Sequence, residues 1–159
     1  MKKICMFLTL FLGFSPLAMA NINKDEAVDM VKALTKEGIE QLVDTSASAE
    51  EKNKRFERLF TQNLDLDFIG KYVLGRYWRS ANAQQRREFI NLYREFNVKI
   101  WSKRFDEFRG KKFVFDGTSA ANNPNQIFVN TSVPMKEGKP AGVKWRVYDH
   151  NGKLKIIDI

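Results

Sequence analysis

Large apolar residues in the first two thirds of the chain recur mostly every three or four positions, the spacing that predicts amphipathic helices. The first expected helix covers residues 23 to about 43. A second begins at Ser48, which forms a capping-box pattern with Glu51. A short third helix ends near Gly75, where a helix terminus tolerates glycine.

The fourth expected helix has the clearest pattern. Asn82 and Gln85 form a second capping-box pattern at its start. An apolar stripe follows at positions i, i+4, i+7 and i+11, made of Phe89, Tyr93, Phe96 and Ile100. Charged residues occupy the remaining faces, so we expect a one-sided helix whose apolar face is mostly aromatic.

After Gly110 the apolar period changes to two, which predicts β-strands. Strands are expected at residues 113–115, 127–133, 143–147 and from 154 onward. Asp116-Gly117 is interpreted as part of a loop, and Asn151-Gly152 predicts a type I′ hairpin. The predicted fold class is α+β, with N-terminal helices packed on one face of a four-stranded antiparallel meander and enclosing an apolar cavity.

The N-terminus has the organisation of a secretory signal peptide. Lys2 and Lys3 precede an apolar run at residues 4–14, and Ala18 and Ala20 supply small residues at −3 and −1. The run is too short for a membrane-spanning helix, which needs about 20 residues. We therefore expect residues 1–20 to be a cleavable signal peptide and residues 21–159 a single domain located in the periplasm. An uncleaved N-terminal anchor remains the alternative.

Composition narrows the possible partners. The signal carries two of the eight net positive charges, which leaves about +6 on the mature chain. A net positive charge suits binding to an anionic membrane surface or to an acidic partner. Because the protein is expected to be exported, nucleic acid is the weakest candidate for a partner. A surface that only keeps the protein soluble explains the charge as well. The only cysteine, Cys5, lies in the signal, so the mature chain has no disulfide.

Few residues point to catalysis. His150 is the only histidine and lies in the predicted hairpin turn, where exposure to solvent is the usual state. Asp65 and Asp67 precede an apolar helical run, which favours a helix cap over paired catalytic carboxylates. No motif of a nucleophile, a phosphate loop or a metal site is present. We expect no catalytic residue, no metal and no cofactor, and a chain that is not an enzyme.

The excess of large apolar side chains has two interpretations. A helix stripe that faces an apolar sheet is most often a filled core. The same arrangement, slightly opened, forms a cavity of roughly 300–1,000 Å³, which is the usual size of a small-molecule site. The pattern alone does not distinguish the two.

Residues 65–96 resemble the signature of the MlaC family, also called the toluene-tolerance auxiliary family, which are periplasmic phospholipid-binding proteins. The matching positions are Asp67, Phe68, Val73, Leu74, Gly75, Trp78, Gln84, Gln85, Phe89 and Tyr93. Residues 143–147 and 155–159 are also similar to family segments. Family members continue past this point into a G-x-S-L segment and a closing helix, so a C-terminally truncated form is expected.

The resemblance implies a carrier whose helices and sheet enclose the acyl tails of a phospholipid. It would shuttle lipid between an outer-membrane lipoprotein complex and an inner-membrane ABC transporter, which maintains lipid asymmetry of the outer membrane. The candidate lining residues are Phe68, Tyr72, Val73, Leu74, Phe89, Tyr93, Phe96, Ile100, Trp101, Val129, Val133, Trp145 and Val147. The candidates for contact with a head group or a partner are Arg76, Arg79 and Arg146.

Three alternatives remain open. The cargo could be another apolar molecule, such as a hopanoid or an isoprenoid. The chain could be a small cone-shaped α+β enzyme related to ketosteroid isomerase, which would require a carboxylate or tyrosine pair in a buried cavity, with Asp65 and Asp67 as the candidate carboxylates. It could also be an adaptor that binds proteins through its basic surface.

Overall fold

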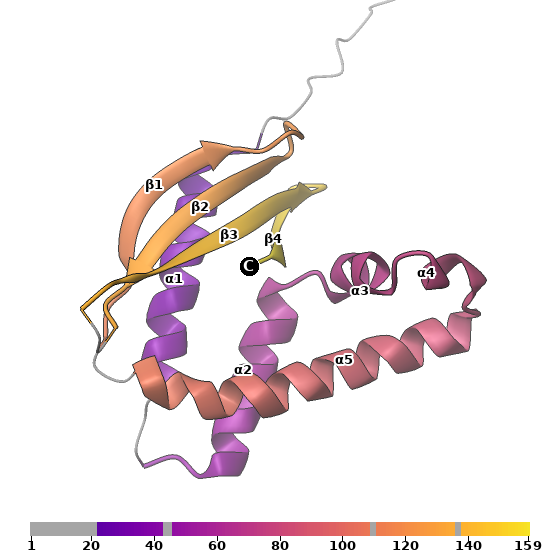
Figure 1. The fold of residues 1–159 in the computed structure, drawn as a ribbon, viewed down its shortest axis with the longest axis horizontal. Coiled ribbons are helices and arrows are strands. Elements are labelled where there is room, and N and C mark those ends of the chain that lie inside the picture. Colours follow the sequence, from indigo (N-terminus) through magenta and orange to yellow (C-terminus); the bar gives the residue numbers. More distant parts are fainter. Residues whose placement is uncertain (1–21, 43–45, 109–110, 136–137) are drawn as a thin grey trace, which may run out of the picture.

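The computed structural model describes residues 22–42, 46–108, 111–135 and 138–159 (Figure 1). The signal peptide predicted for residues 1–20 lies outside these ranges. The helices are α1 (Lys24–Leu42), α2 (Ala49–Asn63), α3 (Leu66–Leu74), α4 (Tyr77–Ser80) and α5 (Ala83–Arg104), followed by the 3₁₀ helix η1 (Phe105–Phe108). The strands are β1 (Val114–Ala120), β2 (Gln126–Val133), β3 (Ala141–His150) and β4 (Lys153–Asp158).

The helix starts follow the predicted caps. Ser48 Oγ accepts a hydrogen bond from the Glu51 backbone N–H at 3.2 Å, and Glu51 Oε2 accepts from the Ser48 N–H at 3.0 Å. Asn82 and Gln85 exchange the same pair of bonds at 2.9 Å each. Both capping boxes are confirmed, because each pair satisfies N–H groups that have no partner inside the helix.

The strands form one antiparallel sheet in the order β1-β2-β3-β4, so the predicted α+β meander is confirmed. Buried residues alternate with partly exposed residues along the whole of β2, and the helices cover the buried side of the sheet (Figure 1). Asn151 and Gly152 have φ angles of 55° and 78° in the turn between β3 and β4. Two successive positive φ angles define the type I′ turn that the sequence predicted.

The loop predicted at Asp116-Gly117 is wrong. β1 continues through these residues and stays paired with β2, with a register shift between Phe115 and Gly117. Asp116 is therefore the additional residue of a β-bulge. Gly117 has a φ of 121°, a conformation that a residue without a β-carbon adopts easily, and this keeps the strand paired beyond the bulge.

The core lies between the sheet and the first two helices. Its buried residues come from α1, α2, β2, β3 and β4, and include Ala27, Val31, Phe56, Leu59, Phe60, Ile127, Val129, Trp145, Val147 and Ile156. Thr131 is the buried polar residue among the described residues, and its Oγ1 accepts a hydrogen bond from Trp145 Nε1 at 2.9 Å. The indole N–H is thereby satisfied inside an apolar core.

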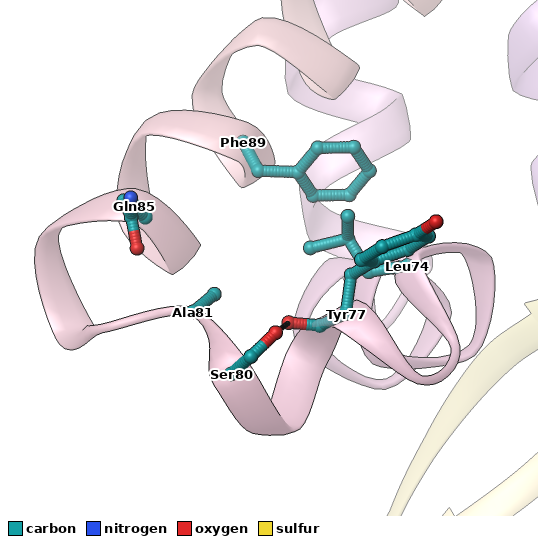
Figure 2. A pocket seen from close by; sticks show the side chains of 6 residues that line it. All are labelled: Leu74, Tyr77, Ser80, Ala81, Gln85 and Phe89. Atoms are coloured by element: carbon teal, nitrogen blue, oxygen red, sulfur yellow. Dashed lines mark hydrogen bonds between the residues drawn. The ribbon is translucent and has the colours of Figure 1, made fainter.

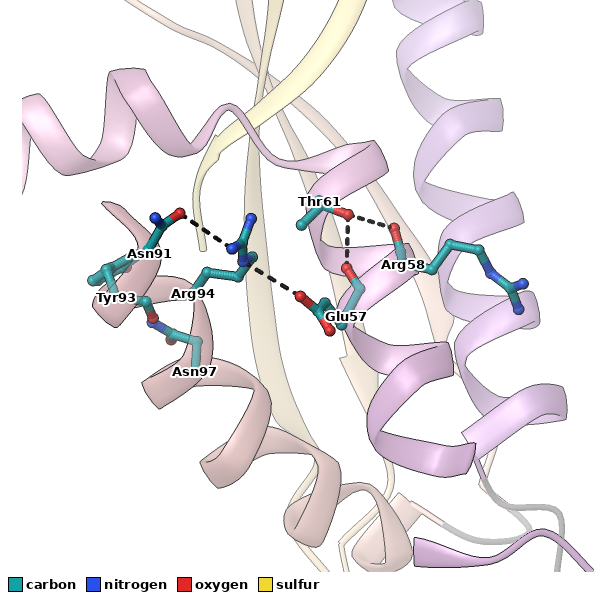
Figure 3. Close-up of polar contacts among 7 residues, drawn as sticks. All are labelled: Glu57, Arg58, Thr61, Asn91, Tyr93, Arg94 and Asn97. Atoms are coloured by element: carbon teal, nitrogen blue, oxygen red, sulfur yellow. Dashed lines mark hydrogen bonds and ion pairs between the residues drawn. The ribbon is translucent and has the colours of Figure 1, made fainter. Parts of the chain in front are cut away.

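α5 crosses α2, and the first turns of α5 lie beyond the edge of the sheet (Figure 1). Arg94 of α5 forms an ion pair with Glu57 of α2, with 3.4 Å between Nε and Oε1 (Figure 3). Arg94 also donates from Nη2 to Asn91 Oδ1 at 3.1 Å. Both charged side chains are partly exposed, so the ion pair adds little to the free energy of unfolding. Its main effect is on how the two helices lie relative to each other.

The beginning of α3 lies beside β4, and α4 and the start of α5 lie farther from the sheet (Figure 1). In the described part of the chain, no helix is both long enough and apolar enough to cross a membrane.

Candidate functional site

A shallow pocket of about 320 Å³ lies between α3, α4 and the beginning of α5 (Figure 2). Its lining is mostly apolar and consists of Leu74, Tyr77, Ser80, Ala81, Gln85 and Phe89. The Ser80 hydroxyl donates to the Tyr77 carbonyl at 3.1 Å, so this polar group is satisfied within its own helix. The pocket thus offers contact with apolar groups and one amide, that of Gln85.

Two close contacts position the helices around the pocket. Gly70 of α3 is buried against Ile90 and Phe89 of α5, and a β-carbon at this position would overlap the Ile90 side chain. Arg86 of α5 donates from Nε to the Trp78 carbonyl at 2.9 Å and lies 5.2 Å from the centre of the Trp78 ring. These contacts attach α3 and α4 to the first turns of α5.

Gly75 separates α3 from α4. It has a φ of 52°, and its N–H donates to the carbonyls of Lys71 and Tyr72 at 3.1 Å each. This left-handed residue ends α3, so the chain reverses and Tyr77 returns toward Leu74 (Figure 2). The expected third helix is confirmed as α3, whereas α4 was not predicted, and the turn between them forms one wall of the pocket.

Large apolar side chains are exposed on the same helices. The exposed fraction is 80% for Tyr72, 53% for Val73 and 58% for Tyr77, and on α5 it is 58% for Leu92 and 63% for Phe96. Scattered single residues of this kind are normal, but several on neighbouring helices beside a pocket indicate a binding surface. Ligand binding would remove this area from water.

The candidate lining residues occur in two separate places. Leu74 and Phe89 line the pocket, and the Tyr93 ring stacks on Phe89 at 6.0 Å. The Phe68 ring lies 5.9 Å from the ring of Tyr148 on β3. The sheet residues lie in the core and not in the pocket; they are Val129, Val133, Trp145 and Val147.

The predicted stripe on α5 does not share a single environment. Phe89 and Tyr93 are partly buried, whereas Phe96 points to solvent. On α5, Tyr93 and Val98 pack against the core. Ile100 is partly buried, and Trp101 is 39% exposed with the Arg104 guanidinium 5.5 Å from its ring.

The three candidate arginines also lie in different places. Arg76 donates from Nη2 to the Tyr77 hydroxyl at 2.8 Å, beside the pocket, and Arg79 is exposed on α4. Arg146 lies on the sheet, where its guanidinium is 5.3 Å from the Phe128 ring. Because side chains alternate along β3, Arg146 faces away from the core that holds Trp145.

Four residues of the pocket were not predicted to line a cavity, namely Tyr77, Ser80, Ala81 and Gln85. Gln85 was interpreted as part of a capping box and of the family signature. The signal that could have found the others is Gly75, because a glycine before Tyr77 allows the sharp reversal that brings α4 back over Leu74.

Asp65 caps α3, as its position before the helix indicated. Its Oδ1 accepts the Phe68 N–H at 2.9 Å, and its own N–H donates to the carbonyl of Ile156 on β4 at 3.0 Å. His150 Nδ1 lies 3.4 Å from Asp65 Oδ2. Asp67 is exposed, so the two carboxylates do not form a buried pair. Among the described residues, no group of three His, Cys, Asp or Glu side chains could hold a metal ion.

The fold and the pocket define an α+β domain whose apolar pocket lies outside the core, between helices that project from the sheet. The family model described as MlaC protein matches residues 30–159, and the chain belongs to the MlaC family. The resemblance found in residues 65–96 is thereby confirmed.

Two relatives extend this comparison. The intermembrane phospholipid transport system binding protein MlaC of Haemophilus influenzae is 22% identical over 99 residues, which are 60% of this chain and 46% of that protein. The chain thus matches about half of the length of this curated relative. A solved structure of the phospholipid-binding protein from Ralstonia solanacearum, in complex with a phospholipid, superposes with a TM-score of 0.72. That match covers 82% of this chain and 74% of the other at 15% identity, and it shows a shared fold.

Proposed function

We propose that this protein binds a phospholipid and carries it across the periplasm, between an outer-membrane lipoprotein complex and an inner-membrane ABC transporter. The role of this transport would be to maintain lipid asymmetry of the outer membrane. The observation that carries the proposal is the apolar pocket between α3, α4 and α5, with exposed apolar residues around it, in a chain of the MlaC family. The proposed location follows from the signal-peptide pattern of residues 1–20.

The physical need for a carrier supports this role. Two acyl chains contain about 30 methylenes, and their exposure to water costs on the order of 24 kcal/mol. Lipid therefore does not cross an aqueous gap at a useful rate unless a protein shields its tails. Such shielding needs apolar surface and no nucleophile.

The pocket is at the lower end of the volume range of small-molecule sites, so it would hold only part of one acyl chain. We infer that the exposed side chains on α3 and α5 cover more of the lipid, with Tyr72, Val73 and Phe96 as the main candidates. Val129, Val133, Trp145 and Val147 are buried in the core, and they would contact lipid only if α1 and α2 separated from the sheet.

The relatives support the proposal through what they are named for. The Haemophilus influenzae relative is named as a component of a phospholipid transport system, and the Ralstonia solanacearum structure contains a phospholipid. The first name describes transport and binding, and the second describes binding. Asp65 acts as a helix cap and Asp67 is exposed, so neither residue is the buried carboxylate that the cone-shaped enzyme would use.

The test is mass spectrometry of an organic extract from the full chain, purified from the periplasm of a bacterial host. We expect stoichiometric phospholipid. Leu74→Gln should lower the lipid content severalfold, because it places an amide in the pocket. Val114→Gln introduces the same amide on β1, at a position that is 51% exposed and does not line the pocket, so its lipid content should stay close to that of the wild type.

A lipid-free extract from folded protein would exclude the carrier role. An equal loss in both variants would place the lipid elsewhere on the protein. The same extract decides the cargo, since a hopanoid or an isoprenoid in place of phospholipid would identify the alternative apolar ligand.

A further inference from the structure

α3, α4 and the start of α5 form the end of the molecule farthest from β1, and this end has an uneven charge (Figure 1). Residues 66–88, which make up α3, α4 and the start of α5, contain five cationic side chains and two acidic side chains, Asp67 and Glu88. The five cations, which we call the basic tip, are Lys71, Arg76, Arg79, Arg86 and Arg87.

The charges of the basic tip are not neutralised by neighbours. Arg76 donates to the hydroxyl of Tyr77, and Arg86 donates to the carbonyl of Trp78, so both have neutral acceptors. Within the described ranges, no carboxylate forms an ion pair with any of the five cations. Their positive potential is therefore directed into solvent.

The same end of the molecule exposes rings and an aliphatic side chain. Tyr72 is 80% exposed, Tyr77 58% and Val73 53%. The Arg76 guanidinium lies 4.9 Å from the centre of the Tyr77 ring. Arginine beside exposed tyrosine is typical of a membrane interface, where the ring reaches the head-group level and the cation meets phosphate. A partner with an acidic protein surface would explain the charges of the basic tip, but it would not explain the exposed valine and tyrosine rings.

We propose that the basic tip docks the protein on an anionic phospholipid bilayer, with Tyr72 and Tyr77 at the head-group level. The pocket shares Tyr77 with this surface, so docking would place its opening beside the bilayer. This inference rests on the proposed carrier function and assigns to it the surface through which lipid enters and leaves.

The test is co-sedimentation of the full chain with vesicles of phosphatidylethanolamine and phosphatidylglycerol, compared with vesicles of phosphatidylcholine alone. We expect binding to the anionic vesicles only, and weaker binding as salt rises to about 0.15 M and above. Each cation near such a surface contributes about fivefold in affinity, so Lys71→Gln/Arg87→Gln should weaken binding roughly 10- to 30-fold.

The matched control removes the same charge elsewhere. Two exposed lysines belong to parts of the fold that are distant from α4 (Figure 1). Lys24 is the first residue of α1, and Lys139 lies in the connection between β2 and β3. Lys24→Gln/Lys139→Gln should bind the anionic vesicles within about twofold of the wild type, because the Debye length is only about 8 Å at 0.15 M salt. Tyr72→Ser should weaken the binding that persists at high salt.

Three results would overturn the docking proposal: equal loss in the control variant, equal binding to the phosphatidylcholine vesicles, or salt-sensitive binding to polyglutamate without vesicle binding. The last would indicate an acidic protein partner. Phospholipid in the organic extract together with no vesicle binding would reject docking and leave the carrier function standing. Vesicle binding by a protein whose extract is lipid-free would reject the carrier function instead.

Discussion

Gly70 of α3 lies so close to Ile90 of α5 that a β-carbon on Gly70 would overlap the δ1 carbon of Ile90. This contact sets the distance between the two helices that carry Leu74 and Phe89, and both of these residues line the pocket. The dimensions of the pocket therefore depend on a residue that does not line it.

Gly70→Ala should be destabilising when Ile90 is present, because the isoleucine must leave its rotamer at a cost of about 1 kcal/mol. Ile90→Val removes the δ1 carbon, so the same alanine substitution should be neutral or stabilising in that background, where only the helix-favouring effect of alanine remains. Urea unfolding of the four proteins gives the coupling energy, which we expect to be about 1 kcal/mol. A coupling near zero would contradict the close contact of α3 with α5.

Thr131→Val should destabilise the core by about 1–3 kcal/mol, since it leaves the buried indole N–H of Trp145 without an acceptor. In a Trp145→Phe background the same change should cost less, because no indole donor remains. Thr118→Val is the control, at an exposed position on β1 that pairs with Val129, and it should change stability by less than about 0.5 kcal/mol. Thermal unfolding of these variants tests the assignment, and equal effects at both threonines would refute it.

Asp65→Ala should reduce stability by about 1 kcal/mol, because it removes the acceptor of the Phe68 N–H at the start of α3. Asp67→Ala, in the first turn of the same helix, loses only an interaction with the helix dipole, which is worth about 0.3–1 kcal/mol. Asp65→Asn keeps the capping oxygen and should stay close to the wild type. Urea unfolding should rank the three variants in this order, and a larger effect at Asp67 would be inconsistent with the cap.

Gly117→Ala on β1 and Gly142→Ala on β3 form a matched pair, because the two strands lie on either side of β2. At both positions a new β-carbon would meet no atom within 4 Å, but only Gly117 has a positive φ, of 121°. Gly117→Ala should therefore cost about 1–3 kcal/mol through backbone strain at the bulge, and Gly142→Ala should be nearly neutral. Equal stabilities in differential scanning calorimetry would show that β1 does not need the left-handed conformation.

The elements that were predicted correctly depend on interactions between residues close in sequence. The Ser48–Glu51 and Asn82–Gln85 boxes join residues three positions apart, and the Asn151-Gly152 turn depends on the φ preferences of two adjacent residues. The loop expected at Asp116-Gly117 was wrong because the same residues suit a turn or a bulge. Pairing of β1 with β2 decides between them, and at the bulge it joins Phe115 to Thr131 and Gly117 to Asn130, which are far apart in sequence.

The site was predicted less completely, for a similar reason. The apolar period of α5 predicted one face for Phe89, Tyr93, Phe96 and Ile100, but the helix is covered by α2 along one part and by α3 along another. Phe96 falls where none of these elements covers it and is 63% exposed. Periodicity identifies a helix that has an apolar face, but it does not identify which element covers each turn.

The sequence by itself determined the order of helices and strands apart from α4, together with the caps and the hairpin, since these follow from local spacing and backbone preference. It also carried the resemblance in residues 65–96 through which the family was first recognised. Only the tertiary structure placed Trp145 and Val147 in the core and Leu74 and Phe89 in a pocket outside it. The physical reason is the close approach of Gly70 to Ile90 and the reversal at Gly75, which set the positions of α3 and α4 on α5.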